Sequence, residues 1–409
     1  MGEELAMAFL TELVFKRLIR TGTLFIAFPE GRIRRFGTGR APVAGMRINT
    51  SAAERGLVRN PGLAFGESFM DGAIEPLDCS LYELLYVLMT NMNDDGHVVE
   101  RVAATVRYAR RQWSQFNTHR SSRHNVAHHY DLGNDFYRLF LDDDWQYSCA
   151  YFRTGNETLE QAQRDKKLHI AAKLRLDRPD LEVLDIGCGW GGMALTLARD
   201  FGARVTGITL SDQQLDVARE RAAKAGLSDR VHFEKCDYRD VARRFDRIVS
   251  VGMFEHVGIG HFPRFFRMIR DCLRDDGVAL VHSIGRKDGA GSTNPWIAKY
   301  IFPGGYAPAL SETLTAVERS GLWVTDCEVL RLHYAHTIAL WRERFEAQRD
   351  GIRAMYDERF CRMFELYLAA AELSFRVQGH MNFQLQLTRD ILAVPITRDA
   401  MFSAEQASG

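Results

Sequence analysis

Hydrophobic and polar residues alternate in a regular rhythm from residue 182 onward, where short apolar runs are separated by segments of helical periodicity. The apolar runs predict strands over residues 182–186, 204–209, 231–235, 246–251 and 277–282. Helices are predicted between them, one ending near 201 and two spanning 211–225 and 261–273. Such alternation of strand and helix predicts a parallel sheet covered by helices on both faces.

The first part of the chain has a different pattern. Residues 4–20 have the spacing of an amphipathic helix, with one apolar face formed by Leu5, Phe9, Leu13 and Leu18. Short strands are predicted over 23–28 and 45–49, followed by a helix over 51–58 and another that begins after Ser80. This order predicts a small α+β domain that ends near residue 112.

A chain of 409 residues is too long for one ordinary core, so two domains are expected. We predict an N-terminal domain over 1–112 that docks on lipid or membrane, a basic linker over 113–125, a catalytic domain over 126–396 and a flexible tail over 397–409. Trp113 and Phe116 lie among arginines near the linker. They favour packing on a neighbouring domain over stacking on nucleic-acid bases.

Charge is balanced overall but uneven along the chain. The formal net charge is zero, which argues against a dedicated nucleic-acid binder. Between residues 16 and 59, however, ten lysines and arginines stand against Glu30 and Glu54. This excess suits an anionic surface such as phospholipid headgroups, expected to be contacted by Arg32, Arg34 and Arg35, although a merely solvated face would look the same.

Cysteine usage and the start of the chain favour the cytoplasm. The seven cysteines are widely spaced and form no C-x-x-C pair. The acidic start, Met1 to Glu4, does not resemble a signal peptide, and no run approaches the roughly 18 apolar residues of a spanning helix. Any membrane contact is therefore expected to be peripheral. No metal is expected, because carboxylates with ligand spacing are missing around His124, His128 and His129.

A glycine-rich turn follows the first strand of the second half. Its sequence, Asp185-Ile186-Gly187-Cys188-Gly189-Trp190-Gly191, runs from an apolar strand into a helix N-terminus. Glycines let a backbone approach a ligand closely, and dinucleotide-binding proteins hold pyrophosphate at a similar turn. Here an acid precedes the first glycine. Asp185 can engage the ammonium group of a methionine moiety, which favours S-adenosylmethionine over a dinucleotide.

The ends of the next two strands are less specific. After the second strand, Thr209, Ser211 and Gln214 would bind the ribose hydroxyls with hydroxyls and an amide. Asp212 could serve as the acid instead, although Ser211 followed by Asp212 also suits a helix N-cap. After the third strand, Cys236 and Asp237 lie where an adenine is usually held. Asp237 would accept a hydrogen bond from the exocyclic amine.

Further segments carry a family resemblance. Residues 129–137, 147–152, 252–258 and 295–304, with the glycine turn and 209–211, closely resemble cyclopropane-fatty-acid-phospholipid synthases over about 125–390. Residues 66–72 also resemble the bacterial phospholipid-acting members. The resemblance implies an α/β class I methyltransferase fold, with a Rossmann-like seven-stranded sheet and a smaller N-terminal α+β domain. It also implies S-adenosylmethionine as cofactor and a homodimer.

The resemblance further implies a set of site residues. The cofactor would be lined by Tyr147, Ser148, Asp185, Gly187, Gly189, Gly191, Thr209, Leu210, Ser211, Gln214, Cys236 and Asp237. A bicarbonate ion would be held by Cys149, Glu255, His282, Ile284 and Tyr334. Taken singly, His282 would more often be a core histidine, Cys149 a small buried hydrophobe and Tyr334 a packing residue.

The implied activity is methylene transfer from S-adenosylmethionine to the cis double bond of an unsaturated phospholipid acyl chain, at the inner face of the membrane. One departure concerns Ala371, where several family members carry a cysteine, with Glu372 beside it. If Glu372 turned inward, a methyl-branched or methylene product would be favoured over a ring. A solvent-facing Glu372 is the simpler expectation. A catalytically decayed lipid-binding protein is a third alternative.

Overall fold

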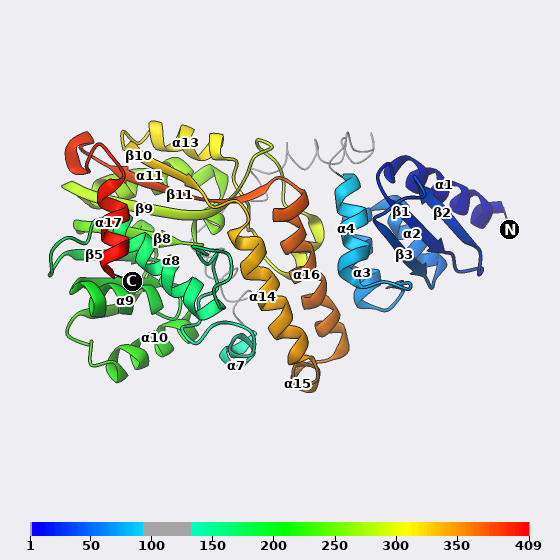
Figure 1. Ribbon diagram of the computed structural model, residues 1–409, viewed down its shortest axis with the longest axis horizontal. Helices are drawn as coiled ribbons and strands as arrows, with labels where there is room; N and C mark the ends of the chain where they lie inside the picture. Colours follow the sequence, from blue (N-terminus) through cyan, green and yellow to red (C-terminus); the bar gives the residue numbers. More distant parts are fainter. Residues whose placement is uncertain (1, 93–131, 409) are drawn as a thin grey trace. The chain divides into compact units, whose positions relative to one another are not determined.

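The computed structural model describes residues 2–92 and 132–408 (Figure 1). The chain divides into two compact units: the first combines 1–110 with 292–303 and 338–379, and the second contains the remaining segments. The predicted domain boundary at 112 and the basic linker over 113–125 lie outside the described residues, as do His124, His128 and His129.

The first unit contains a four-stranded sheet in the order β2-β1-β3-β4. The strands are β1 (Thr23–Ala27), β2 (Ile33–Gly37), β3 (Val43–Ile48) and β4 (Ile74–Pro76). β1 pairs antiparallel with β2 and parallel with β3, and β3 pairs antiparallel with β4. The strands predicted near 23 and 45 are thus present, whereas β2 and β4 were not predicted.

Within residues 2–92, four helices accompany this sheet: α1 (Gly2–Leu18), α2 (Ser51–Arg59), α3 (Pro61–Met70) and α4 (Leu81–Met92). Local sequence determines where they begin. The Thr50 hydroxyl caps α2, and Pro61 occupies the first turn of α3, where its missing N–H costs nothing. Ser80 and Glu83 cap α4 reciprocally, the Ser80 N–H donating to Glu83 Oε2 at 2.8 Å.

Later segments of the chain complete the first unit. They are α12 (Pro295–Tyr300), the end of α14 (His333–Ala347), α15 (Arg349–Met355) and α16 (Glu358–Val377). Trp296 Nε1 donates to Met70 Sδ at 3.2 Å, and Arg362 donates to the Phe69 carbonyl at 3.2 Å. The second unit therefore differs from the predicted domain 126–396, because α12 packs against α3, and α16 packs against α3 and α4.

The second unit is built on a seven-stranded sheet in the order β10-β11-β9-β8-β5-β6-β7. Its strands are β5 (Glu182–Ile186), β6 (Arg204–Thr209), β7 (Val231–Lys235), β8 (Phe245–Val251), β9 (Leu273–Arg286), β10 (Trp323–Val329) and β11 (His380–Thr388). β5 to β9 pair in parallel, as predicted, and β11 runs antiparallel to both β9 and β10. The last two strands were not predicted.

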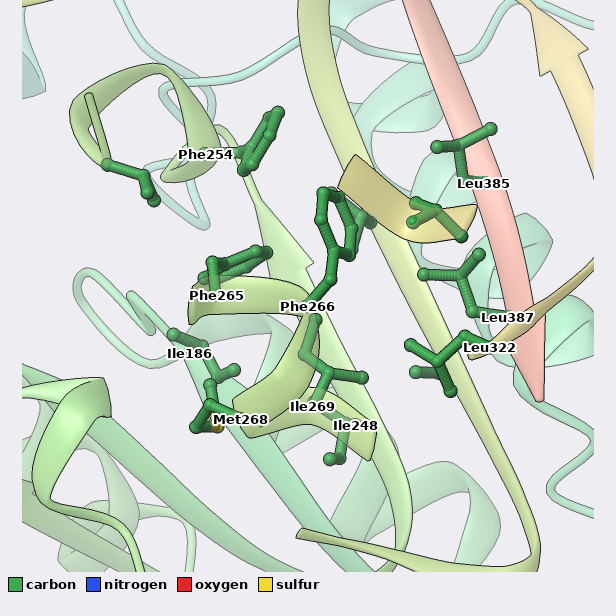
Figure 2. Packing of buried hydrophobic residues seen from close by; sticks show 14 of the residues in the cluster. Ile186, Ile248, Phe254, Phe265, Phe266, Met268, Ile269, Leu322, Leu385 and Leu387 are labelled. Carbon is green, nitrogen blue, oxygen red and sulfur yellow. The ribbon is translucent and has the colours of Figure 1, made fainter. Parts of the chain in front are cut away.

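Helices cover both faces of this sheet, and alternate strand residues point to opposite sides. Val183 lies in the core beneath α8 (Leu159–Leu174), α9 (Gly192–Phe201) and α10 (Asp212–Lys224). Leu184 lies in the core beneath α11 (Phe262–Cys272) and α13 (Leu310–Glu318). Figure 2 shows this second core, where Phe254, Phe265 and Phe266 pack together near Leu385 and Leu387 of β11.

Smaller elements join these helices and strands. They are α7 (Gly133–Arg138) and the 3₁₀ turns η1 (Tyr238–Asp240), η2 (Phe254–His256), η3 (Ile259–His261) and η4 (Ile391–Ala393). Across the described ranges, none of the helices combines the length and hydrophobicity needed to cross a bilayer.

The C-terminal segment does not form the predicted flexible tail. Residues Asp399–Ser408 form α17, which packs on α8. Glu405 contacts His169 on α8, and Arg398 forms an ion pair with the buried carboxylate of Asp326 on β10. Charged residues of this segment therefore have partners on α8 and β10. The prediction of a flexible tail over 397–409 was wrong.

Candidate cofactor-binding and catalytic site

The glycine turn joins β5 to α9 and leaves an open space at its centre. A Cβ atom added at Gly187 would lie 2.8 Å from Met253, and one added at Gly191 would lie 2.6 Å from Phe233. Packing therefore requires glycine at both positions. Gly189 has a φ of +55°, and a Cβ added there would meet nothing within 4 Å. Its backbone faces the space in which a ligand would lie.

Asp185 precedes this turn as a buried carboxylate. Its side chain is 2% exposed, and Oδ2 has no hydrogen-bond partner among the described residues. Burial raises the pKa of Asp185 to about 7, although the charge of nearby Lys166 opposes this rise. A buried unpaired carboxylate is unfavourable, and a cationic ligand group would compensate it. The site thus fits the ammonium group of S-adenosylmethionine.

The segment around Tyr147 and Ser148 is held by two side chains of α8. Lys166 Nζ donates to Gln146 Oε1 at 2.6 Å and to Ser148 Oγ at 2.9 Å. Gln163 Nε2 donates to the carbonyl oxygens of Gln146 and Ser148 at 3.2 and 2.9 Å. Because Ser148 Oγ accepts from Lys166, the hydroxyl proton remains available for an acceptor such as a cofactor carboxylate.

Neither Lys166 nor Gln163 was predicted from the sequence. Both are fully buried, and burial lowers the pKa of Lys166 to about 8. A signal was present, because Leu159, Gln163, Lys166 and Ile170 follow each other at steps of four, three and four. That spacing places the two polar residues in the apolar stripe of the helix.

The residues after β6 organise one another. Thr209 Oγ1 donates to Gln214 Oε1 at 3.1 Å, and the Ser211 hydroxyl accepts from the Gln214 N–H at 3.3 Å. Ser211 is therefore an N-cap of α10, as one of the two sequence interpretations proposed. Leu210, between Thr209 and Ser211, follows the last residue of β6. Because β6 pairs with β5, Leu210 lies beside the glycine turn that follows β5.

The carboxylate of Asp237, after β7, already has strong partners. It accepts from Arg239 Nε at 2.8 Å and from Arg239 Nη2 at 2.6 Å, and both side chains are 3% exposed. The neighbouring Cys236 Sγ lies 3.3 Å from the Asp237 carbonyl. The carboxylate retains lone pairs for an adenine amine, but it is oriented by Arg239, which was not predicted.

Glu255 lies in η2, shortly after β8, and is another buried carboxylate of this unit. Its Oε1 accepts a hydrogen bond from the Ile284 N–H at 2.6 Å. Its Oε2 is buried and has no hydrogen-bond partner within the described ranges. Burial raises the pKa of Glu255 to about 7, against the lowering effect of the Ile284 N–H. Glu255 and Ile284 are therefore brought together, and Met253, which packs on Gly187, places them near the glycine turn.

His282 lies on β9, two residues before Ile284, and its ring is enclosed by amides. Nε2 lies 3.0 Å from Asn382 Nδ2, and Nδ1 lies 3.1 Å from Gln384 Nε2. Burial lowers the pKa of His282 to about 3, so the ring is neutral. It therefore has the environment of a hydrogen-bonded core histidine. Asn382 and Gln384 were not predicted from the sequence, because they lie on β11, a strand that was not predicted.

Cys149 and Tyr334 complete the predicted set. Cys149 is fully buried, and burial raises the pKa of its thiol, so the reactive thiolate is disfavoured. The neighbouring Ala150 N–H donates to Thr337 Oγ1 at 3.0 Å. Thr337 lies three residues after the buried Tyr334 on α14, on the same helix face. This face therefore lies beside the Cys149 segment.

Glu372 belongs to the first unit and is not solvent-facing, contrary to the simpler expectation. It is 2% exposed and accepts hydrogen bonds from Tyr82 Oη at 2.9 Å, Arg342 Nε at 3.1 Å and Arg376 Nε at 2.7 Å. The Glu372 carboxylate is therefore occupied by three donors of the same unit. Glu372 thus joins α4, α14 and α16.

These features together define a class of protein. The parallel sheet with one reversed strand, the glycine turn open at Gly189 and the unpaired Asp185 before it define an S-adenosylmethionine-dependent class I methyltransferase. Residues 117–385 match the family described as mycolic acid cyclopropane synthetase, and the chain belongs to this family.

Named relatives include both ring-forming and methyl-transferring enzymes. The chain is 42% identical to a probable fatty acid methyltransferase of Pseudomonas putida, over 68% of this chain and 73% of the relative. It is 35% identical to the cyclopropane-fatty-acyl-phospholipid synthase of Escherichia coli K12, over 90% and 96%. Among solved structures, the mycolic acid cyclopropane synthase CmaA1, complexed with SAH and CTAB, is 31% identical with a TM-score of 0.61, over 65% of this chain and 97% of that one.

Proposed function

We propose that this enzyme transfers a methylene group from S-adenosylmethionine to the cis double bond of an unsaturated phospholipid acyl chain, forming a cyclopropane ring. The observation that carries the proposal is Glu255, a buried carboxyl group with one unpaired oxygen and a pKa near 7. Such a group exchanges a proton at neutral pH, and ring closure requires a proton to leave.

The proposed reaction balances without an added oxidant or reductant. The alkene π electrons form a bond to the methyl carbon as its bond to sulfur breaks, which releases S-adenosylhomocysteine and leaves a carbocation on the chain. A C–H bond of the transferred methyl then supplies the electrons for the second ring bond, and its proton departs. An alkene is a poor nucleophile, so the protein must align it with the sulfonium and exclude water.

The proton lost in ring closure needs an acceptor close to the cation. A bicarbonate ion, when bound, would supply a base beside the cation. Glu255 fits it, because a protonated Oε2 can donate to an oxyanion, but the Ile284 N–H is engaged by Glu255 Oε1 and His282 by two amides. We therefore assign to Glu255 the role of orienting that base and exchanging its proton.

A phospholipid substrate is supported by the extent of the similarity. The relative named cyclopropane-fatty-acyl-phospholipid synthase aligns over 90% of this chain, whereas CmaA1 aligns over 65%. The phospholipid-synthase relative therefore shares sequence with the chain beyond its methyltransferase region. Peripheral contact with the inner face of an anionic membrane, a cytoplasmic location and a homodimer remain predictions; sedimentation equilibrium checks the last.

A second candidate is a fatty-acid methyltransferase that gives a branched product without ring closure, favoured by the 42%-identical relative of that name. Incubation of the protein with trideuteromethyl-labelled cofactor and monounsaturated phospholipid separates the two. Ring formation leaves two deuterium atoms in the product and no double bond that diimide can reduce. A reducible double bond after methyl transfer would establish the branched product, and cofactor binding without any transfer would support a decayed lipid-binding protein.

A further inference from the structure

The four-stranded sheet of the first unit has one face turned to α1, and its opposite face is covered only in part: Leu77 lies over Gly45, and Thr23 and Ala27 are buried. Leu24, Ile26 and Met46 point to the α1 side and are fully buried. On the opposite face, Phe25, Ile33 and Val43 are 37%, 58% and 52% exposed. The register places Ile33 opposite Ala27 and Val43 opposite Thr23, on either side of the level of Phe25. These three side chains form an exposed apolar surface on three adjacent strands.

Arginines lie within the same face. The strand register pairs Phe25 with Arg35 and Ala27 with both Ile33 and Arg47, so these side chains point the same way. Arg35 and Arg47 are exposed, and neither forms an ion pair with a described residue. We call Phe25, Ile33, Val43, Arg35 and Arg47 the outer sheet face. The acid that the register places beside it, Glu75, pairs with Arg362 at 3.3 Å.

The other two arginines expected to meet headgroups are engaged elsewhere. Arg32 forms ion pairs with Glu12 at 3.1 Å and Glu30 at 2.8 Å, and Arg34 pairs with Glu12 at 3.4 Å. Since Glu12 belongs to α1, Arg34 lies on the α1 side of the sheet. Of the three arginines named from the sequence, only Arg35 belongs to the outer sheet face.

We propose that the outer sheet face docks on an anionic phospholipid bilayer, with Ile33, Phe25 and Val43 entering the headgroup boundary and Arg35 and Arg47 contacting phosphates. Exposed apolar side chains flanked by exposed arginines match both layers of such a surface, whereas a nucleic acid would not use the apolar residues. The choice of a lipid partner rests on the proposed phospholipid substrate; the location of the face rests on the register and exposure alone.

Paired variants of the full-length protein test this proposal. R35Q/R47Q removes two charges from the outer sheet face, and R32Q/R34Q removes two from the α1 side as a matched control. I33T/V43T removes the apolar contact while keeping β-branched side chains. Binding is measured by co-sedimentation with vesicles of phosphatidylglycerol and phosphatidylcholine at two salt concentrations. Methyl transfer is measured in parallel on monounsaturated phospholipid in detergent micelles.

R35Q/R47Q is expected to weaken vesicle binding at least tenfold at low salt, because an arginine near an anionic surface contributes about fivefold. I33T/V43T should weaken it at both salt concentrations, and R32Q/R34Q should bind like the wild type. Equal losses in both arginine pairs would overturn the assignment of the face. Unchanged vesicle binding together with altered sedimentation velocity would show a protein partner instead.

The micelle assay separates this proposal from the proposed function. All three variants should retain methyl transfer in micelles, which also shows that they are folded. Loss of vesicle binding with transfer retained supports the docking face. Failure of the wild type to methylate micellar phospholipid would refute the proposed function. The comparison of vesicle binding among the variants would still show whether the outer sheet face docks on the bilayer.

Discussion

At the scale of single residues, the site is defined by polar groups that lack partners. Asp185 and Glu255 are both buried carboxylates with one oxygen that has no partner among the described residues, at the carboxyl ends of β5 and β8. The sequence could predict both, because Asp185 lies near the end of an apolar strand and Glu255 shortly follows another. It could not show that His282 is enclosed by Asn382 and Gln384, since that contact depends on the pairing of strands about a hundred residues apart.

The raised pKa of Asp185 predicts a pH-dependent cofactor affinity. The ammonium group of S-adenosylmethionine requires the ionised carboxylate, and the pKa of Asp185 is about 7. Affinity should therefore fall about tenfold for each pH unit below 7. Calorimetric titration between pH 5.5 and 7 measures this slope. D185N should bind weakly and without the slope, and an equal slope in D185N would assign it to another group.

The open space at Gly189 predicts that cofactor binding does not tolerate a side chain there. G189L should abolish binding, because leucine would fill the space that the ligand needs. G226L is a matched control, since Gly226 also has a positive φ (+66°) and open surroundings, so it carries the same backbone strain of about 1 kcal/mol. Equilibrium dialysis with labelled cofactor compares the two. Similar affinity in both variants would place the cofactor elsewhere.

Replacing Glu255 by glutamine should lower activity and, above neutral pH, raise stability. E255Q is expected to bind cofactor but to lose at least about 100-fold in turnover, because the exchangeable proton is removed. Near-normal turnover would exclude Glu255 from the chemistry. A pKa raised from 4.5 to about 7 means that folding disfavours the ionised form. This cost is absent below about pH 4.5 and complete above 7, so urea unfolding should find E255Q more stable by about 3 kcal/mol at pH 8 but not at pH 4.5.

At the scale of elements, the strands of the parallel sheet follow from apolar runs, whereas β10 and β11 do not. β11 alternates Phe383, Leu385 and Leu387 with amides that are equally buried, so its polar positions suggest a solvent-facing side that it does not have. The α17 helix was missed because its stability depends on charged partners on α8 and β10. Local patterns predict an element, but not the buried polar partners it meets.

Lys166 of α8 is expected to contribute to the affinity for S-adenosylmethionine. K166M should raise the KM for S-adenosylmethionine roughly tenfold or more, because two charge-assisted hydrogen bonds to Gln146 and Ser148 are lost. K173M is the control: Lys173 is also buried on α8, but it donates to Gln384 at 2.8 Å and contacts Glu328. It should lower stability without changing the KM. A parallel rise in both variants would reduce Lys166 to a general structural role.

At the scale of the whole molecule, the two units follow spatial packing rather than sequence order. Nothing in the sequence of α16 identifies α3 and α4 as the helices against which it packs. The sequence therefore placed residues 338–379 with the methyltransferase sheet. In the structure, Arg362 and Glu372 bind Phe69 and Tyr82 of the first unit.

This interleaving limits how such enzymes can be recombined. A chimera with one crossover near residue 110 would take α3 and α4 from one parent and α12 and α16 from the other, so the interlocking pairs Trp296–Met70 and Glu372–Tyr82 would come from different proteins. Functional shuffling of the first unit between relatives requires three inserts exchanged together. In evolution, the same constraint would make these distant stretches of the gene change in concert.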